Sequence, residues 1–295
     1  MVDNKIPVII ISFNRPDYLE LVLLSLKRQS LPLDLFKIYL FQDGGIDRFS
    51  GKVVADTSKS IETFKYIFPT QTIIESDVNL GVALNYDRAE KFAFDVLKAD
   101  YAFFFEDDLV LGFNYLKALM RMTEFALDEP RVGYVAAYGD HYASPKDQIS
   151  NAKKVIMLDH KWGFALTKRQ WLLQKEIIDG YIDIIKTSNY QSRNHGQIQK
   201  YFRSLGFVSP GSSQDAAKDV ASCVLGTVKL NCFLPFAKYI GKKGTHFNPE
   251  FYDKGKWGES IVYNGDVPDF NFPNKDQIEN IYQMFSSASK DGDAQ

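Results

Sequence analysis

Residues 101–108 constrain the fold more than any other stretch, because five apolar residues lead without a break into Glu106, Asp107 and Asp108. An uninterrupted apolar run of this kind predicts a strand that is buried on both faces, as in a mainly parallel sheet covered by helices. Three adjacent carboxylates at the end of such a strand repel one another, and a shared cation removes that repulsion. A solvated acidic turn is the alternative, but the adjoining buried strand favours a cation site. Oxygen ligands select a hard ion, Mn²⁺ or Mg²⁺, over zinc.

The first predicted strand also runs into a polar loop. Residues 8–11 are β-branched, which predicts a strand, and leucine and valine residues at helical spacing follow the loop. Between the two, Asn14 is a plausible helix N-cap and Pro16 suits a first helical turn. Capping alone leaves Arg15 without a role. The alternative is that Ser12, Asn14 and Arg15 meet a phosphate or a base at this helix start.

Two further segments repeat the pattern of strand, polar turn and helix. Residues 37–41 predict a strand that ends near Asp43 and two glycines, and residues 72–74 predict a third strand. Strands that alternate with helices predict an α/β fold with a doubly wound, mainly parallel sheet. Ligands of such sheets bind beyond the carboxyl ends of the strands. We therefore expect Arg15, Asp43 and the carboxylates of residues 106–108 to lie at one edge of the sheet.

The second half of the chain carries further candidate segments. Residues 139–151 are polar and rich in turn formers, which predicts a mobile loop over the site. Trp162 and Phe164 belong to an aromatic stretch that is core by default, although the apolar face of a sugar ring also stacks on such side chains. Asp215 stands near the start of a predicted helix, where capping alone would also account for it.

A glycine-punctuated basic loop lies near the end of the chain, with Lys242, Lys243 and His246. Such a loop can close on phosphate, although solvated surface lysines are equally expected from the composition. Residues 286–295 have the composition of a disordered tail.

The charge balance and the cysteines limit the classes of partner and location. Lys and Arg number 35 against 37 Asp and Glu, so no general positive field attracts nucleic acid or an anionic membrane. The two cysteines show neither metal-ligand spacing nor a disulfide framework, which fits a reducing compartment. No segment reads as a signal peptide or a membrane span. We therefore expect a soluble, cytoplasmic protein.

Several blocks together resemble nucleotide-sugar glycosyltransferases of the GT-A fold, specifically the inverting group of the Golgi N-acetylglucosaminyltransferase I and bacterial family-2-like enzymes. The blocks are Glu106-Asp107-Asp108-Leu109, the loops of Arg15 and Asp43, the stretch 162–166, Gln214-Asp215 and the glycine loop 241–244. The resemblance implies a Rossmann-like, mainly parallel sheet flanked by helices, with a C-terminal acceptor-side lobe. Residues 1–138 would bind the nucleotide-sugar donor. Residues 139–285 would form the acceptor and catalytic-base half of the same domain.

The resemblance also implies roles for single residues. Asp108 would bind Mn²⁺ or Mg²⁺ directly, with His246 as a second candidate ligand and an unpaired surface histidine as the alternative. Asp215, ahead of Asp219, would be the catalytic base. Residues that would contact the acceptor are Trp162 and Phe164. Residues that would contact the donor are Ser12, Asn14, Arg15, Asp43, Asn85, Glu106, Asp107, Lys242 and Lys243.

We predict a metal-dependent inverting glycosyltransferase, a hexosyl- or pentosyltransferase, that uses a nucleotide-diphosphate donor, expected to be a UDP-sugar. Its acceptor would be a glycan, such as a growing polysaccharide, or another hydroxyl compound. The alternative is a non-catalytic module of the same fold that binds nucleotide or glycan. A sugar-phosphate nucleotidyltransferase is disfavoured, because no glycine-rich triphosphate loop follows the first strand.

Overall fold

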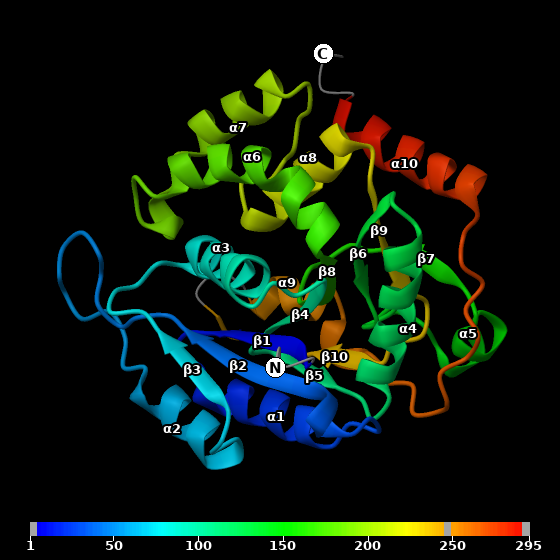
Figure 1. Cartoon of the computed structure of the whole chain (residues 1–295), viewed down its shortest axis with the longest axis horizontal. Helices are drawn as coiled ribbons and strands as arrows, with labels where there is room; N and C mark the ends of the chain where they lie inside the picture. The colour runs from blue at the N-terminus through cyan, green and yellow to red at the C-terminus, as the bar shows by residue number, and fades with distance from the viewer. Residues whose placement is uncertain (1–4, 245–248, 291–295) are drawn as a thin grey trace.

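The computed structural model describes residues 5–244 and 249–290, with residues 288–290 described by their backbone alone. Within these residues, a central sheet of eight strands runs through both halves of the chain, and a sheet of two strands lies beside it (Figure 1). The strands are β1 (Ile6–Ser12), β2 (Phe36–Gln42), β3 (Thr72–Glu75), β4 (Tyr101–Glu106), β5 (Leu109–Leu111), β6 (Val132–Ala136), β7 (Val155–Met157), β8 (Gly163–Thr167), β9 (Val228–Cys232) and β10 (Ala237–Tyr239). The helices are α1 (Pro16–Lys27), α2 (Ser58–Ile67), α3 (Val82–Lys91), α4 (Tyr115–Asp128), α5 (Pro145–Ser150), α6 (Lys168–Ile185), α7 (His195–Ser204), α8 (Gln214–Leu225), α9 (Pro249–Lys254) and α10 (Lys275–Lys290). Short helical turns are η1 (Leu33–Leu35), η2 (Phe92–Val96), η3 (Tyr190–Ser192) and η4 (Trp257–Glu259).

The strand order of the large sheet is β3-β2-β1-β4-β8-β6-β9-β7. The strands β3, β2, β1 and β4 are parallel, β8 is antiparallel to both of its neighbours, and β6 is parallel to β9. The strand β7 then ends the sheet in the antiparallel sense. This mixed α/β architecture, mainly parallel and flanked by helices, confirms the predicted fold class.

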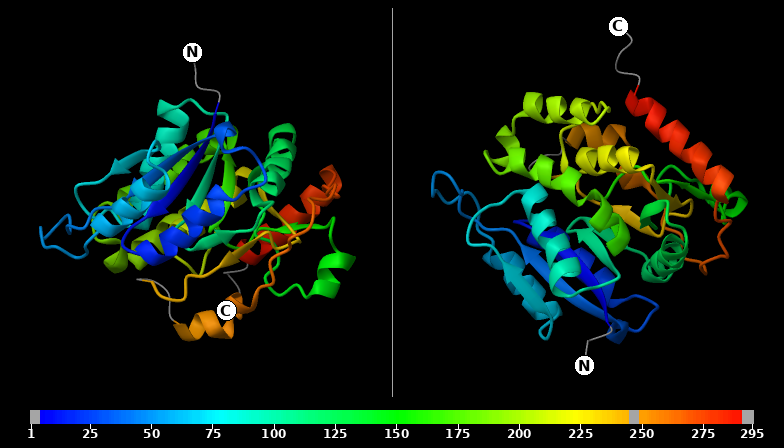
Figure 2. Two further views of the ribbon diagram at one scale, coloured as in Figure 1. Left: turned by 90° about the horizontal axis from the view of Figure 1, so that it is seen from below. Right: turned by 45° about the horizontal axis from the view of Figure 1, so that its top comes forward.

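Helices cover both faces of the sheet. The helices α1 and α2 pack together on one face, while α3, α6, α7 and α8 gather on the other (Figure 1 and Figure 2). The second group shares an apolar cluster of its own, to which Ile182 and Phe202 belong. Because both faces are covered, residues 8–10 of β1 and 103–105 of β4 are fully buried. The unbroken apolar runs in the sequence follow from this two-sided cover.

The register of β1 and β4 sets the position of the carboxylates. Ile11 lies opposite Glu106, so Asp107 and Asp108 follow at the carboxyl end of β4, beside the end of β1. At the end of β2, the backbone N–H of Asp43 donates to the carbonyl of Ser12. The loops after β1, β2 and β4 therefore meet at one edge of the sheet, as the sequence predicts.

The small sheet brings a distant part of the chain to the same edge. The strand β10 pairs antiparallel with β5, which places Tyr239 opposite Leu109. The backbone N–H of Ile240 then donates to the carbonyl of Asp108. The loop that begins at Gly241 therefore starts directly beside the carboxylates.

Two local predictions near the site are wrong. Arg15, not Asn14, occupies the N-cap position of α1, and the Asn14 side chain is exposed. The segment 139–151 is not a plain loop, because it contains α5. The N-cap Ser144 and Asp147 close a capping box there, and this reciprocal pair stabilises the first turn.

The predicted tail begins too early. The helix α10 extends to residue 290, and Ser286 within it is 1% exposed. Packing of α10 on α8 and β9 stabilises a segment whose composition alone suggests disorder. Residues 291–295 lie outside the described residues. In the part of the chain that the structure describes, no helix combines the length and the hydropathy that crossing a membrane requires.

Candidate functional site

Asp107 and Asp108 are buried at the end of β4, and Arg15 lies against both. Nη1 of Arg15 donates to Oδ2 of Asp108 at 2.6 Å, and Nη2 donates to Oδ1 of Asp107. Oγ of Ser12 donates to Oδ2 of Asp107 at 3.4 Å. The guanidinium carbon also lies 5.6 Å from the centre of the Tyr18 ring. The structure thus brings Ser12, Arg15 and the carboxylates together.

The charges in this cluster shift one another's ionisation. Burial, with the charges of Asp108 and Asp215, raises the pKa of Glu106 well above its ordinary value. Burial also raises the pKa of Asp108 to about 6, although Arg15 acts in the opposite direction. Burial lowers the pKa of Arg15, but the charges of Asp107 and Asp108 outweigh it, so the net shift is upward. The carboxylates carry more negative charge than one guanidinium neutralises, which favours a further cation.

Replacing Glu106 by Gln should stabilise the protein at neutral pH. A carboxyl whose folded-state pKa is raised favours folding while it is protonated, and this contribution is lost as the pH rises from its unfolded pKa through its folded pKa. We expect the melting temperature of Glu106→Gln to exceed that of the wild type by about 2 °C or more at pH 8, and by less at pH 5. A melting temperature below the wild type at both pH values would show that Glu106 stabilises the fold.

The oxygens of Asp108 suit a hard divalent ion. Oδ2 accepts from Arg15 and the carboxylate also accepts from the Tyr239 hydroxyl, but buried Oδ1 has no hydrogen-bond partner among the described residues. In residues 5–244 and 249–290, no three or more His, Cys, Asp or Glu side chains are grouped to hold a metal. A divalent ion would therefore take one or two carboxylate oxygens from this chain and the rest from phosphate and water, which is how Mg²⁺ is commonly held.

Gly241 closes one side of the carboxylate cluster. A Cβ atom at this position would overlap Oδ2 of Asp108 and the Tyr239 hydroxyl. We expect Gly241→Ala to lower the free energy of unfolding by about 1–3 kcal/mol, because a well-packed position has no room for a methyl group. Denaturant unfolding measures the change. As a control, Gly196→Ala should cost nothing, since a Cβ atom there meets only ordinary contact with Asn194; equal losses in both variants would contradict the prediction.

Asp215 lies at the start of α8, where Ser213 provides the N-cap. Its charge is one of the influences that raise the pKa of Glu106. Nε2 of Gln214 donates to Oδ1 of Asp215 at 2.8 Å. No Lys, Arg or His among the described residues forms an ion pair with this carboxylate. Asp215 can therefore accept a proton without first breaking an ion pair.

Asp219, one turn further along α8, has a different environment. Its carboxylate forms ion pairs with the buried Lys161 and with Lys229, the latter at 2.8 Å. Burial raises the pKa of Asp219, but the two lysines outweigh it and hold it below the ordinary value. Both oxygens are thus occupied by cations, which makes Asp219 a structural residue and leaves Asp215 as the stronger candidate base. The sequence did not assign a role to Lys161, whose only signal is its place before the aromatic stretch.

An aromatic stack lies next to the carboxylates. The Trp162 ring is parallel to the His160 ring at 4.3 Å and to the Tyr239 ring at 4.1 Å, and the Trp257 ring meets it edge-on at 5.6 Å. Trp162 is 8% exposed. Through its hydroxyl, Tyr239 links this stack to Asp108. Sequence reasoning missed Tyr239, because the pairing of β10 with β5 joins segments far apart in the chain.

The prediction that Phe164 contacts an acceptor is wrong. Phe164 lies inside β8, is fully buried, and stacks on Phe104 at 5.4 Å and Tyr86 at 6.1 Å. Its ring belongs to the core between the sheet and the helices, where no ligand can reach it. Trp162 differs because it precedes β8 and lies at the rim of the sheet.

Asp43 and Asn85 form hydrogen bonds with other groups of the chain in this structure. Asp43 accepts the backbone N–H groups of Leu80 and Gly81 at 2.7 and 2.9 Å, and burial raises its pKa in spite of these bonds. Nδ2 of Asn85 donates to a backbone carbonyl of β2 at 3.0 Å, and Oδ1 accepts from Arg88. Both residues are buried and anchor the turn between β3 and α3 to β2. Their contacts with a nucleotide stay predictions.

The basic loop begins beside the site, and hydrogen bonds connect both of its lysines to other parts of the chain. Nζ of Lys242 donates to the Asp253 carboxylate of α9 at 2.8 Å, and the Lys243 backbone N–H donates to the Tyr18 hydroxyl at 3.1 Å. Both lysine side chains are exposed. The candidate ligand His246 lies outside the described residues.

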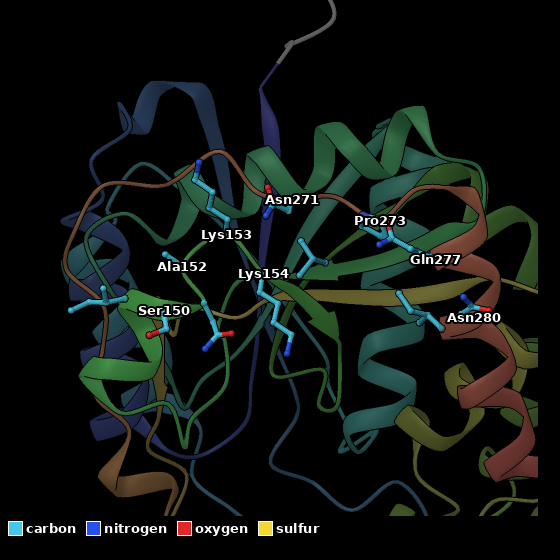
Figure 3. A pocket seen from close by; sticks show the side chains of 12 residues that line it. Ser150, Ala152, Lys153, Lys154, Asn271, Pro273, Gln277 and Asn280 are labelled. Carbon is cyan, nitrogen blue, oxygen red and sulfur yellow. The ribbon is translucent and has the colours of Figure 1, made fainter.

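A cavity of 780 Å³ lies away from these residues (Figure 3). It is bordered by the segment 149–155 and by residues of 271–281, and Figure 3 shows Lys153, Lys154, Asn271 and Asn280 around it. None of the predicted site residues lines it.

No protein-family model and no curated protein matches the sequence. Solved structures do resemble it. One is the mannosyltransferase PcManGT from Pyrobaculum calidifontis in complex with GDP-Man and Mn²⁺, at 11% identity and a TM-score of 0.49 over 96% of this chain and 69% of that chain. Another is S. aureus TarS, at 14% identity and a TM-score of 0.42 over 75% of this chain and 42% of that chain. A third is S. aureus TarS 1–349, at 14% identity and a TM-score of 0.46 over 96% of this chain and 72% of that chain. The first of these structures is thus named a mannosyltransferase. At 11–14% identity, the similarity concerns the fold and says nothing of the donor, the acceptor or the mechanism of this chain.

Proposed function

We propose that this chain is a metal-dependent inverting glycosyltransferase that moves a sugar from a nucleotide-diphosphate donor, expected to be a UDP-sugar, to a hydroxyl acceptor. One observation carries the proposal: the start of α8 lies near the end of β4, because Nζ of Lys161 donates to the carbonyl of Asp215 at 3.4 Å and the carbonyl of the adjoining Trp162 accepts from the Glu106 backbone N–H at 2.8 Å. Asp107 and Asp108 form ion pairs with Arg15, whereas Asp215 has no cationic partner among the described residues. Such a division suits two separate chemical tasks.

On this proposal, Asp215 is the general base. The acceptor oxygen attacks the anomeric carbon from the face opposite the leaving group, its proton passes to the Asp215 carboxylate, and the bond from that carbon to the diphosphate oxygen breaks. Asp108, with Asp107, would hold the divalent ion, which supplies Lewis-acid neutralisation of the leaving diphosphate when bound. Gln214 orients Asp215 through its 2.8 Å hydrogen bond. The rim position of Trp162 supports a role in packing against the acceptor.

The rival function is binding of nucleotide or glycan without turnover, since a fold by itself does not establish chemistry. A binder needs the carboxylates and Arg15 but has no use for a general base. The role of Asp215 therefore separates the two functions. The chain has only two cysteines, Cys223 and Cys232, and both are buried; this supports a reducing, cytoplasmic location, which we propose with the activity.

Calorimetric titration of the purified protein with UDP, GDP and dTDP, each with and without Mn²⁺, tests the proposal. We expect one nucleotide to bind, and Mn²⁺ to raise its affinity by about tenfold or more, because Asp108 would hold the ion and the ion would offset the negative charge of the diphosphate. That nucleotide fixes the donor class, and a panel of its sugars with radiolabelled transfer to oligosaccharides follows. If none of the three binds with or without Mn²⁺, the proposed function is wrong.

A further inference from the structure

Arg15 lies against Asp107 and Asp108, the carboxylates that are proposed to hold the divalent ion. Its guanidinium spans Asp107 and Asp108, two carboxylates that are 2% and 1% exposed. The pair is charge-assisted and uses two nitrogens of one guanidinium, which is the geometry that holds Arg most firmly. The structure therefore shows the carboxylates with a cation supplied by the chain itself.

This arrangement opposes a divalent ion. The ion would approach Oδ1 of Asp108, which has no hydrogen-bond partner among the described residues, while Arg15 holds Oδ2 of the same carboxylate at 2.6 Å. Two cations on one carboxylate repel each other, and the low polarity of a buried site strengthens that repulsion. Tight binding of the ion therefore requires that Arg15 lose part of its hold on the carboxylates.

The Arg15 side chain has room to leave the carboxylates and bind other groups. Its side chain is 26% exposed, and it stands at the N-cap of α1, where it provides no side-chain cap for the first turn. The unused N–H groups of a helix start attract phosphate oxygens, and a guanidinium forms bidentate hydrogen bonds with phosphate. A diphosphate at this edge of the sheet would therefore offer Arg15 new partners a short distance from the old ones.

We infer that Arg15 is an internal counter-cation of Asp107 and Asp108, which the diphosphate of the donor draws away, so that the divalent ion binds tightly only together with the donor. The inference rests on the proposed function and deepens it by assigning the order in which the site fills. Because coupling between two ligands is reciprocal, the ion strengthens donor binding by the same factor. Arg15 acts here as a positioning residue for both ligands.

Titration of free Mn²⁺ by electron paramagnetic resonance tests the inference without any turnover. The proteins are the wild type, Arg15→Gln and the control Arg121→Gln, whose side chain forms exposed ion pairs with Glu124 and Asp269. Each is titrated with Mn²⁺ alone and with the nucleoside diphosphate that binds in calorimetry. We expect the diphosphate to tighten Mn²⁺ binding to the wild type and the control about tenfold or more. Arg15→Gln should bind Mn²⁺ alone about tenfold more tightly than the wild type, and the diphosphate should add correspondingly less.

The outcomes separate the inference from the function beneath it. If Arg15→Gln binds Mn²⁺ alone no more tightly than the wild type, while the diphosphate still tightens Mn²⁺ binding to the wild type, Arg15 is not the counter-cation and the proposed function stands. If no diphosphate changes Mn²⁺ binding to the wild type, the proposed function fails. If the melting curve shows that Arg15→Gln is unfolded, the Mn²⁺ titration of Arg15→Lys tests the inference in its place. A lysine cannot span both carboxylates, so its Mn²⁺ affinity should lie above the wild type; an affinity at or below the wild type overturns the inference.

Discussion

Asp215→Asn should reduce the rate of sugar transfer about 10³-fold, because an amide cannot accept the proton of the acceptor hydroxyl. The substitution changes little else. Oδ1 of the asparagine can still accept from Gln214, and the carboxylate that is lost has no ion pair among the described residues. Affinity for the nucleotide should therefore stay within about threefold of the wild type. Calorimetry measures that affinity, and steady-state transfer at saturating donor measures the turnover number.

Asp219→Asn is the matched control on the same helix. It removes a partner from Lys161, which is fully buried, and from Lys229. Breaking a buried ion pair on one side typically costs about 3–5 kcal/mol, so this variant should lose stability while its folded fraction keeps most of the turnover. A turnover number that falls in Asp219→Asn and not in Asp215→Asn would move the base role to Asp219. Normal nucleotide binding with no transfer by the wild type to any acceptor would favour the binding module.

Asp108→Asn should abolish the metal-dependent part of nucleotide binding. The variant keeps the size of the side chain but loses the charge that a hard cation needs, and Arg15 then neutralises the remaining Asp107. We expect the gain in nucleotide affinity on adding Mn²⁺, about tenfold or more in the wild type, to vanish. Transfer should fall at least about 10³-fold, because neutralisation of the leaving diphosphate contributes several kcal/mol.

The effect of Asp108→Asn on folding can be measured separately from its effects on Mn²⁺-dependent binding and on transfer. Burial raises the pKa of Asp108 to about 6, so above that pH its charge opposes folding, and a neutral side chain at this position should leave the melting temperature at or above that of the wild type at pH 8. Asp100→Asn serves as the control, since its exposed carboxylate precedes β4 at the opposite end of the strand. If Asp108→Asn retains the full response to Mn²⁺, Asp108 is not a metal ligand and the site assignment is wrong.

The sequence predicted the sheet and its functional edge well, because burial on both faces leaves a strong local signal. The apolar runs of residues 8–11 and 101–105 predicted β1 and β4, and the polar residues that follow meet where parallel strands end. The positions of Arg15 and the carboxylates after strand ends also predicted that they lie at one edge of the sheet, where the structure pairs them.

The sequence could not supply contacts that depend on distant pairing. Tyr239 reaches Asp108 only because β10 adds to β5, and neither short strand has a distinctive pattern. The error at Phe164 has a similar origin, since an aromatic stretch does not reveal which of its rings the helices cover. Asp215 and Asp219 look alike in the sequence, and the lysines that occupy Asp219 come from two other segments.

The ion pairs of Arg15 with Asp107 and Asp108 also bear on how the protein is produced. Small metal-binding domains often stay unfolded until the ion arrives, and their abundance then follows the metal supply. Here Arg15 offsets part of the charge of the buried carboxylates, so a newly synthesised molecule can complete its core before any ion is present. If the proposed function holds, the protein would then be folded before ion and donor arrive, and folding would not limit its activity.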